Sequence, residues 1–277
     1  MSEKFQRGRT AKFRLLMLAL AALTSVITLP MTAAQAYTPL YGNDVSWPQC
    51  PAGVGSPRPG YGLPMPASTA KFVLIGLTDG PGFTTNPCLA TQVAWAKAHH
   101  VYTAGYAVAT YPTTRQLTAY AHSGPYSTAT LLGKLRNTGY AQARYNVARI
   151  KASGLTTPMV WIDVEFYPFR PWHASTLYNR AVVQGVVLGY QRSGFRVGFY
   201  STTTQWPSIV GRLNYTVPEW HTAGPRTMAV ALSRCSERSF QGGRIILAQW
   251  WTASRDYDLT CPAYSSTGSL AYYFHKY

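Results

Sequence analysis

The chain has 277 residues, of which 47% are hydrophobic, 14% aromatic and only 12% charged. This composition excludes intrinsic disorder, which requires few aromatic and many charged residues. The charge is strongly unbalanced, because 25 Lys and Arg face 9 Asp and Glu, giving a formal net charge of +16. Since carboxylates are scarce, the position of each one carries information.

The first 36 residues have the pattern of a signal peptide. A basic segment, residues 4–14, precedes an apolar stretch, residues 15–29, and a small-x-small signal-peptidase site ends at Ala36. An uncleaved N-terminal anchor is the alternative, but the small-residue site favours cleavage. We therefore expect an exported protein, secreted or associated with the cell wall, without stable membrane insertion after cleavage.

Five short runs after this segment are continuously apolar, which is typical of buried parallel strands. They are residues 72–77, 102–109, 159–162, 196–200 and 245–248. Segments with helical spacing lie between them, roughly at 86–100, 140–153 and 175–193. This alternation predicts an α/β fold of βα units around a parallel sheet, in a single domain from residue 37 to 277.

Two stretches depart from the alternation. Residues 51–70 hold five prolines and four glycines, which predicts a surface loop between the first two strands. Residues 110–138, rich in Tyr, Thr, Ser and Gly, are interpreted as an insertion on the third βα loop. In a barrel such loops lie at the catalytic face. The aromatic tail after Cys261 is expected to pack back on the body.

Export determines how the four cysteines are interpreted, since disulfides persist in oxidising compartments. Cys50, Cys88, Cys235 and Cys261 predict two disulfides, for which three pairings are possible. The most local pairing joins Cys50 to Cys88 and Cys235 to Cys261. A zinc site is disfavoured because neither a C-x-x-C pair nor a histidine cluster accompanies these residues.

Five acidic residues lie inside or directly after a predicted strand: Asp44, Asp79, Asp163, Glu165 and Asp258. A carboxylate at the end of a buried strand is costly to desolvate, so a purely solvated role is a poor explanation for it. Strand carboxyl ends are where α/β folds bind ligands. These positions are therefore candidates for chemistry.

The sharpest pattern is Asp163-Val164-Glu165 at the end of the third run. Alternate residues of a strand face the same side, about 6.6 Å apart along the chain, so the two acids face one space. Two neighbouring buried acids cannot both ionise at their ordinary pKa, and one is expected to stay protonated. Glycoside hydrolysis needs this division into an acid and an anion. A metal-binding pair, or a hydrogen-bonded structural pair, is the alternative.

Eight short motifs follow one another between residues 43 and 259. They are Asn43-Asp44-Val45-Ser46-Trp47-Pro48-Gln49, the strand 72–80 that ends in Thr78-Asp79-Gly80, Gly105-Tyr106, Asp163-Val164-Glu165, Gly198-Phe199-Tyr200-Ser201, Pro218-Glu219-Trp220, Ala248-Gln249-Trp250 and Asp256-Tyr257-Asp258-Leu259. In this order they resemble the strand motifs of the glycoside hydrolase family 25 lysozymes. The resemblance covers nearly all of the chain after the signal peptide.

The resemblance implies an irregular, TIM-like (β/α) barrel with parallel strands first and short antiparallel strands last. It also implies cleavage of the β-1,4 bond between N-acetylmuramic acid and N-acetylglucosamine in peptidoglycan, or action on another cell-wall glycan. By the same resemblance Glu165 is the general acid and Asp163 orients or stabilises the substrate, while Asp44 and Asp258 line the pocket. Asp258 fits the family pattern better than Asp256, because Leu259 follows it.

The substrate-binding residues implied by the resemblance are Asp79, Tyr106, Tyr200 and Trp250, the aromatic ones as walls that stack on sugar rings. The chain also departs from the family pattern. Asp79 stands where the family usually has Glu, Ala107 where it often has His, and Thr260 where it has Asn. These departures indicate a divergent, exported branch of the family.

Two hypotheses follow, and the fold alone does not separate them. The first is a secreted peptidoglycan hydrolase, a muramidase that acts through carboxylates. The second is a catalytically silent protein on the same barrel that binds cell walls or other glycans. Neither a metal nor a cofactor is expected, and we expect a monomer. The positive charge favours anionic wall polymers, whereas nucleic-acid binding ranks last because the basic residues are scattered.

Overall fold

The computed structural model describes residues 38–166 and 171–277, which form one compact unit. The signal peptide expected at residues 1–36 lies outside these described residues. None of the helices that the structure describes is long and apolar enough to cross a membrane.

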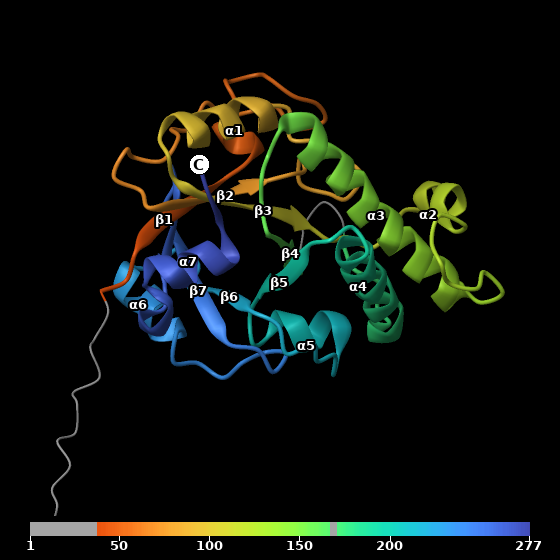
Figure 1. Cartoon of the computed structure of the whole chain (residues 1–277). Coiled ribbons are helices and arrows are strands. Elements are labelled where there is room, and N and C mark those ends of the chain that lie inside the picture. Colours follow the sequence, from red (N-terminus) through yellow and green to blue (C-terminus); the bar gives the residue numbers. More distant parts are fainter. Residues whose placement is uncertain (1–37, 167–170) are drawn as a thin grey trace, which may run out of the picture. The chain divides into compact units, whose positions relative to one another are not determined.

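The strands close into a mixed barrel, which lies at the centre of the described chain with helices around it (Figure 1). In chain order the strands are β1 (Tyr41–Val45), β2 (Phe72–Gly76), β3 (Tyr102–Val108), β4 (Met159–Asp163), β5 (Arg196–Ser201), β6 (Glu219–Thr222), β7 (Ile245–Trp251), β8 (Asp256–Thr260) and β9 (His275–Lys276). Strands β1 to β7 pair in parallel, each with the next. Strand β8 closes the barrel between β7 and β1, antiparallel to both. The predicted order, with parallel strands first and antiparallel strands last, is confirmed.

The helices and turns fill the connections between these strands. They are η1 (Trp47–Gln49), α1 (Leu89–Ala98), α2 (Thr114–Tyr120), α3 (Leu131–Ser153), α4 (Thr176–Gln191), α5 (Gln205–Val210), α6 (Met228–Arg234), η2 (Pro262–Tyr264) and α7 (Thr267–Tyr273). Helices α3 and α4 lie side by side on the outside of the barrel (Figure 1). Gly139 permits this close approach, because a Cβ atom there would lie 2.1 Å from the Val182 carbonyl oxygen.

The side chains of β4 alternate between the two sides of the barrel wall. Met159 and Trp161 face inward and pack with other interior side chains, whereas Val160 and Ile162 pack outward in the core shared with the helices. Gly198 on β5 makes room for the large Trp161 ring, because a Cβ atom at position 198 would lie 2.6 Å from it. This alternation fixes which residues at the strand end face the interior.

The C-terminal tail covers the end of the barrel at which the parallel strands begin. The ring of Phe274 lies 5.1 Å from that of Phe72 at the start of β2, and Leu270 of α7 is buried in the same interior cluster. Strand β9 adds to the start of β3, where His275 pairs with Thr103. The tail thus packs back on the body as predicted, and the opposite end of the barrel is left for a ligand.

Residues 110–138 are more regular than their composition suggests. They contain α2 and the first turns of α3, which begins at Leu131 rather than at residue 140. The side chain of Thr130 caps α3 by accepting a hydrogen bond from the Gly133 amide, at 3.2 Å. Glycines within the first turns of α3 obscured this helix in the sequence pattern. The insertion is therefore a helical element on the outside of the barrel.

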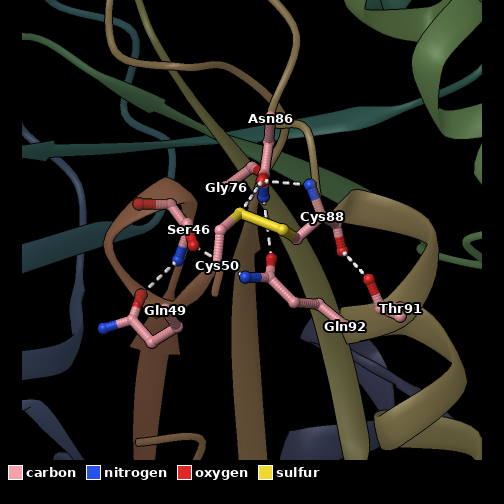
Figure 2. The surroundings of a disulfide bond; sticks show 8 residues. All are labelled: Ser46, Gln49, Cys50, Gly76, Asn86, Cys88, Thr91 and Gln92. Carbon is pink, nitrogen blue, oxygen red and sulfur yellow. Dashed lines mark hydrogen bonds between the residues drawn. A yellow bond between two sulfur atoms is a disulfide. The ribbon is translucent and has the colours of Figure 1, made fainter. Parts of the chain in front are cut away.

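Both disulfides follow the most local of the three possible pairings. Cys50 pairs with Cys88, and Cys235 pairs with Cys261. Figure 2 shows the first of these beside Asn86, whose side chain accepts from the Cys88 amide at 3.0 Å and donates to the Gly76 carbonyl at 2.8 Å. The Cys50–Cys88 disulfide fastens the start of the Pro-rich loop at residues 51–70 to the beginning of α1.

Candidate active site

A pocket of about 290 Å³ opens at the carboxyl ends of the parallel strands. Its lining comes from β1 and β3 to β8: Asp44, Tyr106, Asp163, Glu165, Tyr200, Trp220, Gln249, Trp251 and Asp256. None of these described lining residues is Lys, Arg or His, although the chain carries a large excess of basic residues. Acidic side chains therefore meet here without a basic residue among them.

Asp163 and Glu165 face the pocket together because they follow the inward position of Trp161 with a period of two. Asp163 is 5% exposed, and its Oδ1 atom has no hydrogen-bond partner among the described residues. The backbone around Glu165 is held from two sides. The Trp172 indole donates to the Glu165 carbonyl at 2.9 Å, and the Phe166 amide donates to Gln205 Oε1 at 2.8 Å.

Gln249 on β7 connects the acid of β1 to the aromatic wall. Its Nε2 atom donates to Asp44 Oδ2 at 2.8 Å. Its Oε1 atom accepts from the Tyr200 hydroxyl at 2.8 Å and from the Thr222 hydroxyl at 3.0 Å. These bonds fix the amide orientation, so that its N–H group is aimed at Asp44.

Asp256 and Asp258 lie on the same antiparallel strand but at different depths. Asp256 lines the pocket, whereas Asp258 is fully buried and is absent from the lining. Asp258 Oδ1 accepts a hydrogen bond from the Trp220 indole at 2.8 Å. The sequence analysis preferred Asp258 as the pocket residue. In the structure Asp256 lines the pocket instead, and Asp258 is hydrogen-bonded to the Trp220 indole.

Burial raises the pKa of every acid in this cluster. The pKa of Glu165 rises to about 7, first through burial and then through the charge of Asp44. Burial likewise raises the pKa of Asp44 to about 6, against the opposing hydrogen bond from Gln249. The pKa of Asp256 rises to about 8 through burial and the charges of Asp44 and Glu165.

The two innermost acids follow the same direction. Burial and the charges of Glu165 and Asp44 raise the pKa of Asp163 well above its ordinary value. Burial and the charges of Asp44 and Asp256 do the same for the pKa of Asp258. The cluster therefore retains protons at neutral pH that isolated carboxyl groups would have lost.

The remaining sequence-predicted residues divide into two groups. Tyr106 and Tyr200 line the pocket, and the Tyr106 ring lies 5.8 Å from that of Trp220. Asp79 and Trp250 do not. Asp79 is fully buried and accepts a hydrogen bond from the Arg58 amide at 3.2 Å, so it anchors the Pro-rich loop. Trp250 faces outward and stacks on Tyr257 at 5.2 Å.

Four lining residues were missing from the sequence-based site: Asp256, for which Asp258 was preferred, and Trp220, Gln249 and Trp251. A period-two pattern along β7 contains the signal for two of them, because Gln249 and Trp251 share a face and Trp250 takes the other. The family motif drew attention to the Trp directly after Gln249, which points away from the pocket. The alternation of side chains along β7 therefore predicts the lining residues of this strand better than the family motif does.

A second buried acid lies on the outer side of the barrel wall. Glu219 of β6 is fully buried and accepts hydrogen bonds from His221 Nε2 at 2.8 Å, from the Gln241 amide and side chain, and from the Gly243 amide. Ser239 and the Phe240 amide also donate to it. Despite burial, these bonds lower the pKa of Glu219, with that from His221 contributing most.

The hollow next to Glu219 is larger, about 760 Å³, but has a different lining. Its lining acid is Glu237, which pairs with Arg234 and lies 3.2 Å from His221 Nδ1. It therefore lacks the paired acids that acid–base chemistry requires. Among the described residues, no group of three or more His, Cys, Asp and Glu side chains is placed to hold a metal ion.

Comparisons with known proteins find similarity to lysozyme-like proteins. A family model described as Lysozyme-like protein 1 matches residues 90–227, just under half of the chain. Lysozyme-like protein 5 of Caenorhabditis elegans is 33% identical over 70 residues, which are 25% of this chain and 31% of the relative. Probable GH family 25 lysozyme 5 of Dictyostelium discoideum is 38% identical over 53 residues, 19% of this chain and 24% of the relative. The chain thus matches less than a third of either relative's length.

Solved structures show the same fold at low identity. A muramidase from Acremonium alcalophilum has a TM-score of 0.55 at 16% identity, covering 83% of this chain and 96% of its own. A family 25 glycosyl hydrolase from Bacillus anthracis has a TM-score of 0.52 at 13% identity, covering 88% and 96%. The partial family match, the named relatives and the closed mixed barrel together support similarity to the glycoside hydrolase family 25 lysozymes.

Proposed function

We propose that this protein is an exported peptidoglycan hydrolase that cleaves β-1,4 glycosidic bonds of the N-acetylmuramidase type. The single observation that carries the proposal is the convergence of Asp44, Asp163, Glu165 and Asp256 in one pocket that no basic side chain of the described residues lines. Lysozyme-like relatives and the shared barrel support a wall glycan as the substrate class.

Glu165 is the acid in this scheme. A pKa near 7 leaves a large share of its carboxyl groups protonated at neutral pH, so it can donate a proton to the glycosidic oxygen as the bond to the anomeric carbon breaks. The departing sugar then carries the proton as a hydroxyl group. Water adds to the anomeric carbon, and its proton returns to the Glu165 carboxylate.

Asp163 and Asp44, when ionised, stabilise the positive charge that develops on the sugar. Both are buried, so a charge on either acts through a poorly screening medium. Gln249 fixes Asp44 through its Nε2 atom, which keeps the carboxylate oriented toward the pocket. Asp256 contributes a further acidic group at the rim, and Asp258 acts indirectly by holding Trp220.

The pocket walls suit a sugar ring. Tyr106, Tyr200, Trp220 and Trp251 supply aromatic surface around the acids. Aromatic rings suit the apolar faces of pyranoses, whereas the acids and Gln249 suit the hydroxyl and acetamido groups. This mixture supports a neutral, hydroxyl-rich substrate at the cleavage point.

Two separate observations support export. The first 36 residues have the pattern of a signal peptide, and the chain forms two disulfides with no free cysteine among the described residues. Disulfides of this kind persist outside the reducing cytosol. We therefore place the protein outside the cell or in the cell wall.

The test is the release of reducing ends from purified peptidoglycan by the wild-type protein and by Glu165→Gln. General acid catalysis is worth about 10²–10⁴-fold, so the substitution is expected to lower the rate by at least about 10²-fold. The Gln side chain has the same shape, so the thermal midpoint should stay unchanged or rise. Substitution of the outward Glu237 by Gln is the matched control and should leave the rate unchanged.

Two results would count against the proposal. One is a wild-type protein that sediments with peptidoglycan and releases no reducing ends, which would favour the silent wall-binding alternative. The other is a Glu165→Gln variant that retains the wild-type rate, which would assign the acid to another residue.

A further inference from the structure

A second hollow lies outside the barrel, where the connection after β2 meets α2 and α3. It measures about 570 Å³ and is lined by Phe83, Tyr120, Ser123, Tyr140, Ala141, Arg144 and Tyr145. None of these residues lines the catalytic pocket. Part of the hollow is built by residues 110–138, the insertion to which the proposed catalysis gives no role.

Three of the aromatic rings of this hollow, those of Phe83, Tyr120 and Tyr145, are held by contacts with one another. Phe83 stacks face to face on Tyr120, with centroids 4.3 Å apart and planes within 4°. The same ring meets Tyr145 edge-on at 5.9 Å. Phe83 holds a φ of 63°, a conformation that bulky residues rarely adopt. The Thr85 hydroxyl is hydrogen-bonded to the Tyr145 hydroxyl at 2.7 Å, which ties the loop to α3.

Polar groups in the same hollow remain free to bind a ligand. Tyr140 and Arg144 are four residues apart on α3 and so lie on one face of the helix. Within the described residues, the Tyr120 and Tyr140 hydroxyls make no hydrogen bond. Arg144 is exposed, and its guanidinium makes one long contact, 3.5 Å, to Ser193 Oγ.

The charge around the hollow is positive over a long stretch of chain. No Asp or Glu occurs from residue 80 to residue 162, whereas Arg144 and Arg149 both lie in this stretch beside the aromatic rings. The Arg149 guanidinium lies 5.2 Å from the centre of the Tyr145 ring. An anionic group that enters the hollow therefore meets no acidic neighbour on these elements.

We propose that this hollow is an accessory binding site for a glycan strand that carries carboxylate groups, separate from the catalytic pocket. The inference rests on the proposed function for its substrate class. Ring faces receive pyranose rings, the two phenol hydroxyls receive sugar hydroxyls, and Arg144 pairs with a carboxylate. Binding at two places on one insoluble polymer raises the effective concentration at the catalytic pocket.

The first experiment measures binding to insoluble peptidoglycan by sedimentation, in a Glu165→Gln background so that the polymer stays intact. The double variant Tyr140→Ser/Arg144→Gln is expected to bind about tenfold more weakly, which corresponds to about 1.4 kcal/mol. Tyr272→Ser and Arg244→Gln are matched controls, because both residues are exposed and neither lines this hollow. Both controls should bind like the parent protein.

The second experiment assigns the roles of ring and charge. Chitin offers the same sugar backbone without carboxylates. Tyr140→Ser should weaken binding to both polymers, whereas Arg144→Gln should weaken binding to peptidoglycan alone. Tyr140→Phe should retain most of the affinity, because it keeps the ring. Thermal unfolding of each variant verifies that the fold is intact.

Hydrolysis separates this inference from the proposed function. With Glu165 restored, the double variant should release reducing ends more slowly from insoluble peptidoglycan but cleave a soluble tetrasaccharide fragment at the wild-type rate. Binding equal to that of the parent, or equal losses in the two controls, would overturn the accessory site while leaving the catalytic proposal intact. Loss of binding in the double variant, together with a wild-type protein that binds peptidoglycan but releases no reducing ends, would support the site and reject the catalytic proposal.

Discussion

The inner and outer sides of the barrel wall both bury acidic side chains, in opposite surroundings. On the outer side, Glu219 receives hydrogen bonds from His221, Ser239 and the segment 240–243, and its pKa is lowered. On the inner side, Asp163 leaves one oxygen without a partner, and burial beside Glu165 and Asp44 raises its pKa. The two sites lie on the same barrel and differ mainly in how many donors reach each acid.

This difference separates a structural acid from a chemically competent one. An acid that is surrounded by donors is stable as an anion and has little tendency to take up a proton. An acid that is buried among other acids holds a proton and can release it to a substrate. Glu219 therefore fastens β6 to the segment before β7, whereas the inward acids form a proton reservoir.

The largest effect expected on stability comes from the outer site. Glu219→Gln replaces a carboxylate that accepts from several backbone and side-chain donors, and its new NH₂ group would face donors such as the Gly243 amide. Removing one partner of a buried pair costs about 3–5 kcal/mol, and we expect a loss of that size in the free energy of unfolding. Urea denaturation measures it.

Glu237→Gln is the control for this substitution, because Glu237 is partly exposed and its ion pair with Arg234 is screened by solvent. We expect a loss below about 1 kcal/mol. Equal losses in the two variants would mean that Glu219 holds no special place in the fold.

The next effect concerns the pH dependence of stability, for which the two sites have opposite signs. The inward acids have raised pKa values in the folded state, so their contribution is complete below pH 4 and is lost as pH rises through about 6 to 8. Glu219 has a lowered pKa, so its contribution is present above its ordinary pKa and is lost as pH falls below it. Stability should therefore decline on both sides of a maximum near pH 4 to 5.

One pKa unit corresponds to about 1.4 kcal/mol, so the rise in the pKa of Glu165 from 4.5 to about 7 alone accounts for an alkaline decline on the order of 3 kcal/mol, and the other acids add to it. Thermal unfolding from pH 3 to pH 9 measures it. Asp44→Asn should reduce the alkaline decline, because it removes a charge that raises the pKa values of its neighbours, and Glu219→Gln should reduce the acidic one. A wild-type protein whose stability is flat from pH 5 to pH 9 would contradict the proton reservoir.

The smallest effect is expected from the hydrogen bonds that orient Gln249. Tyr200→Phe removes the donor to Gln249 Oε1 and leaves Thr222 as the remaining donor. A neutral hydrogen bond is worth about 1 kcal/mol, so kcat/KM on a soluble glycan should fall about fivefold. Tyr190→Phe is the matched control, because its buried hydroxyl accepts from Asn146 outside the barrel. A larger loss in Tyr190→Phe than in Tyr200→Phe would count against the role of Gln249.

Much of the fold could be predicted from the sequence because its signals are local. The apolar runs at residues 72–77 and 159–162 are too continuous for a surface strand, and the intervening helical spacing leaves a parallel arrangement as the simplest solution. The start of α3 at Leu131 could not be predicted in the same way. Its glycines are unfavourable for a helix in isolation and are explained only by tertiary contacts, because Gly139 lies against α4 and Gly133 against the Ser127 carbonyl.

The residues of the candidate site also divide into those that local patterns predict and those that depend on tertiary structure. Asp163 and Glu165 could be paired from the period of a strand alone, and Asp44 from its place at a strand end. The depth of Asp258, the outward direction of Trp250 and the anchoring role of Asp79 depend on register between strands distant in sequence. The pairing of Gln249 with Asp258 across β7 and β8 sets which residues of both strands face inward. The register of such a pairing cannot be predicted from the sequence of either strand alone.

The most direct test of the central contrast is a carboxyl-carbon NMR titration of the protein labelled at glutamate. The glutamates of the chain are Glu3, Glu165, Glu219 and Glu237, so the spectrum is simple, and Glu165→Gln and Glu219→Gln assign the two signals that matter. Glu165 should titrate near pH 7 and move to lower pH in Asp44→Asn, while Glu219 should titrate below its ordinary range. Titration of Glu165 near pH 4.3, the ordinary value for glutamate, with no response to Asp44→Asn would contradict the account.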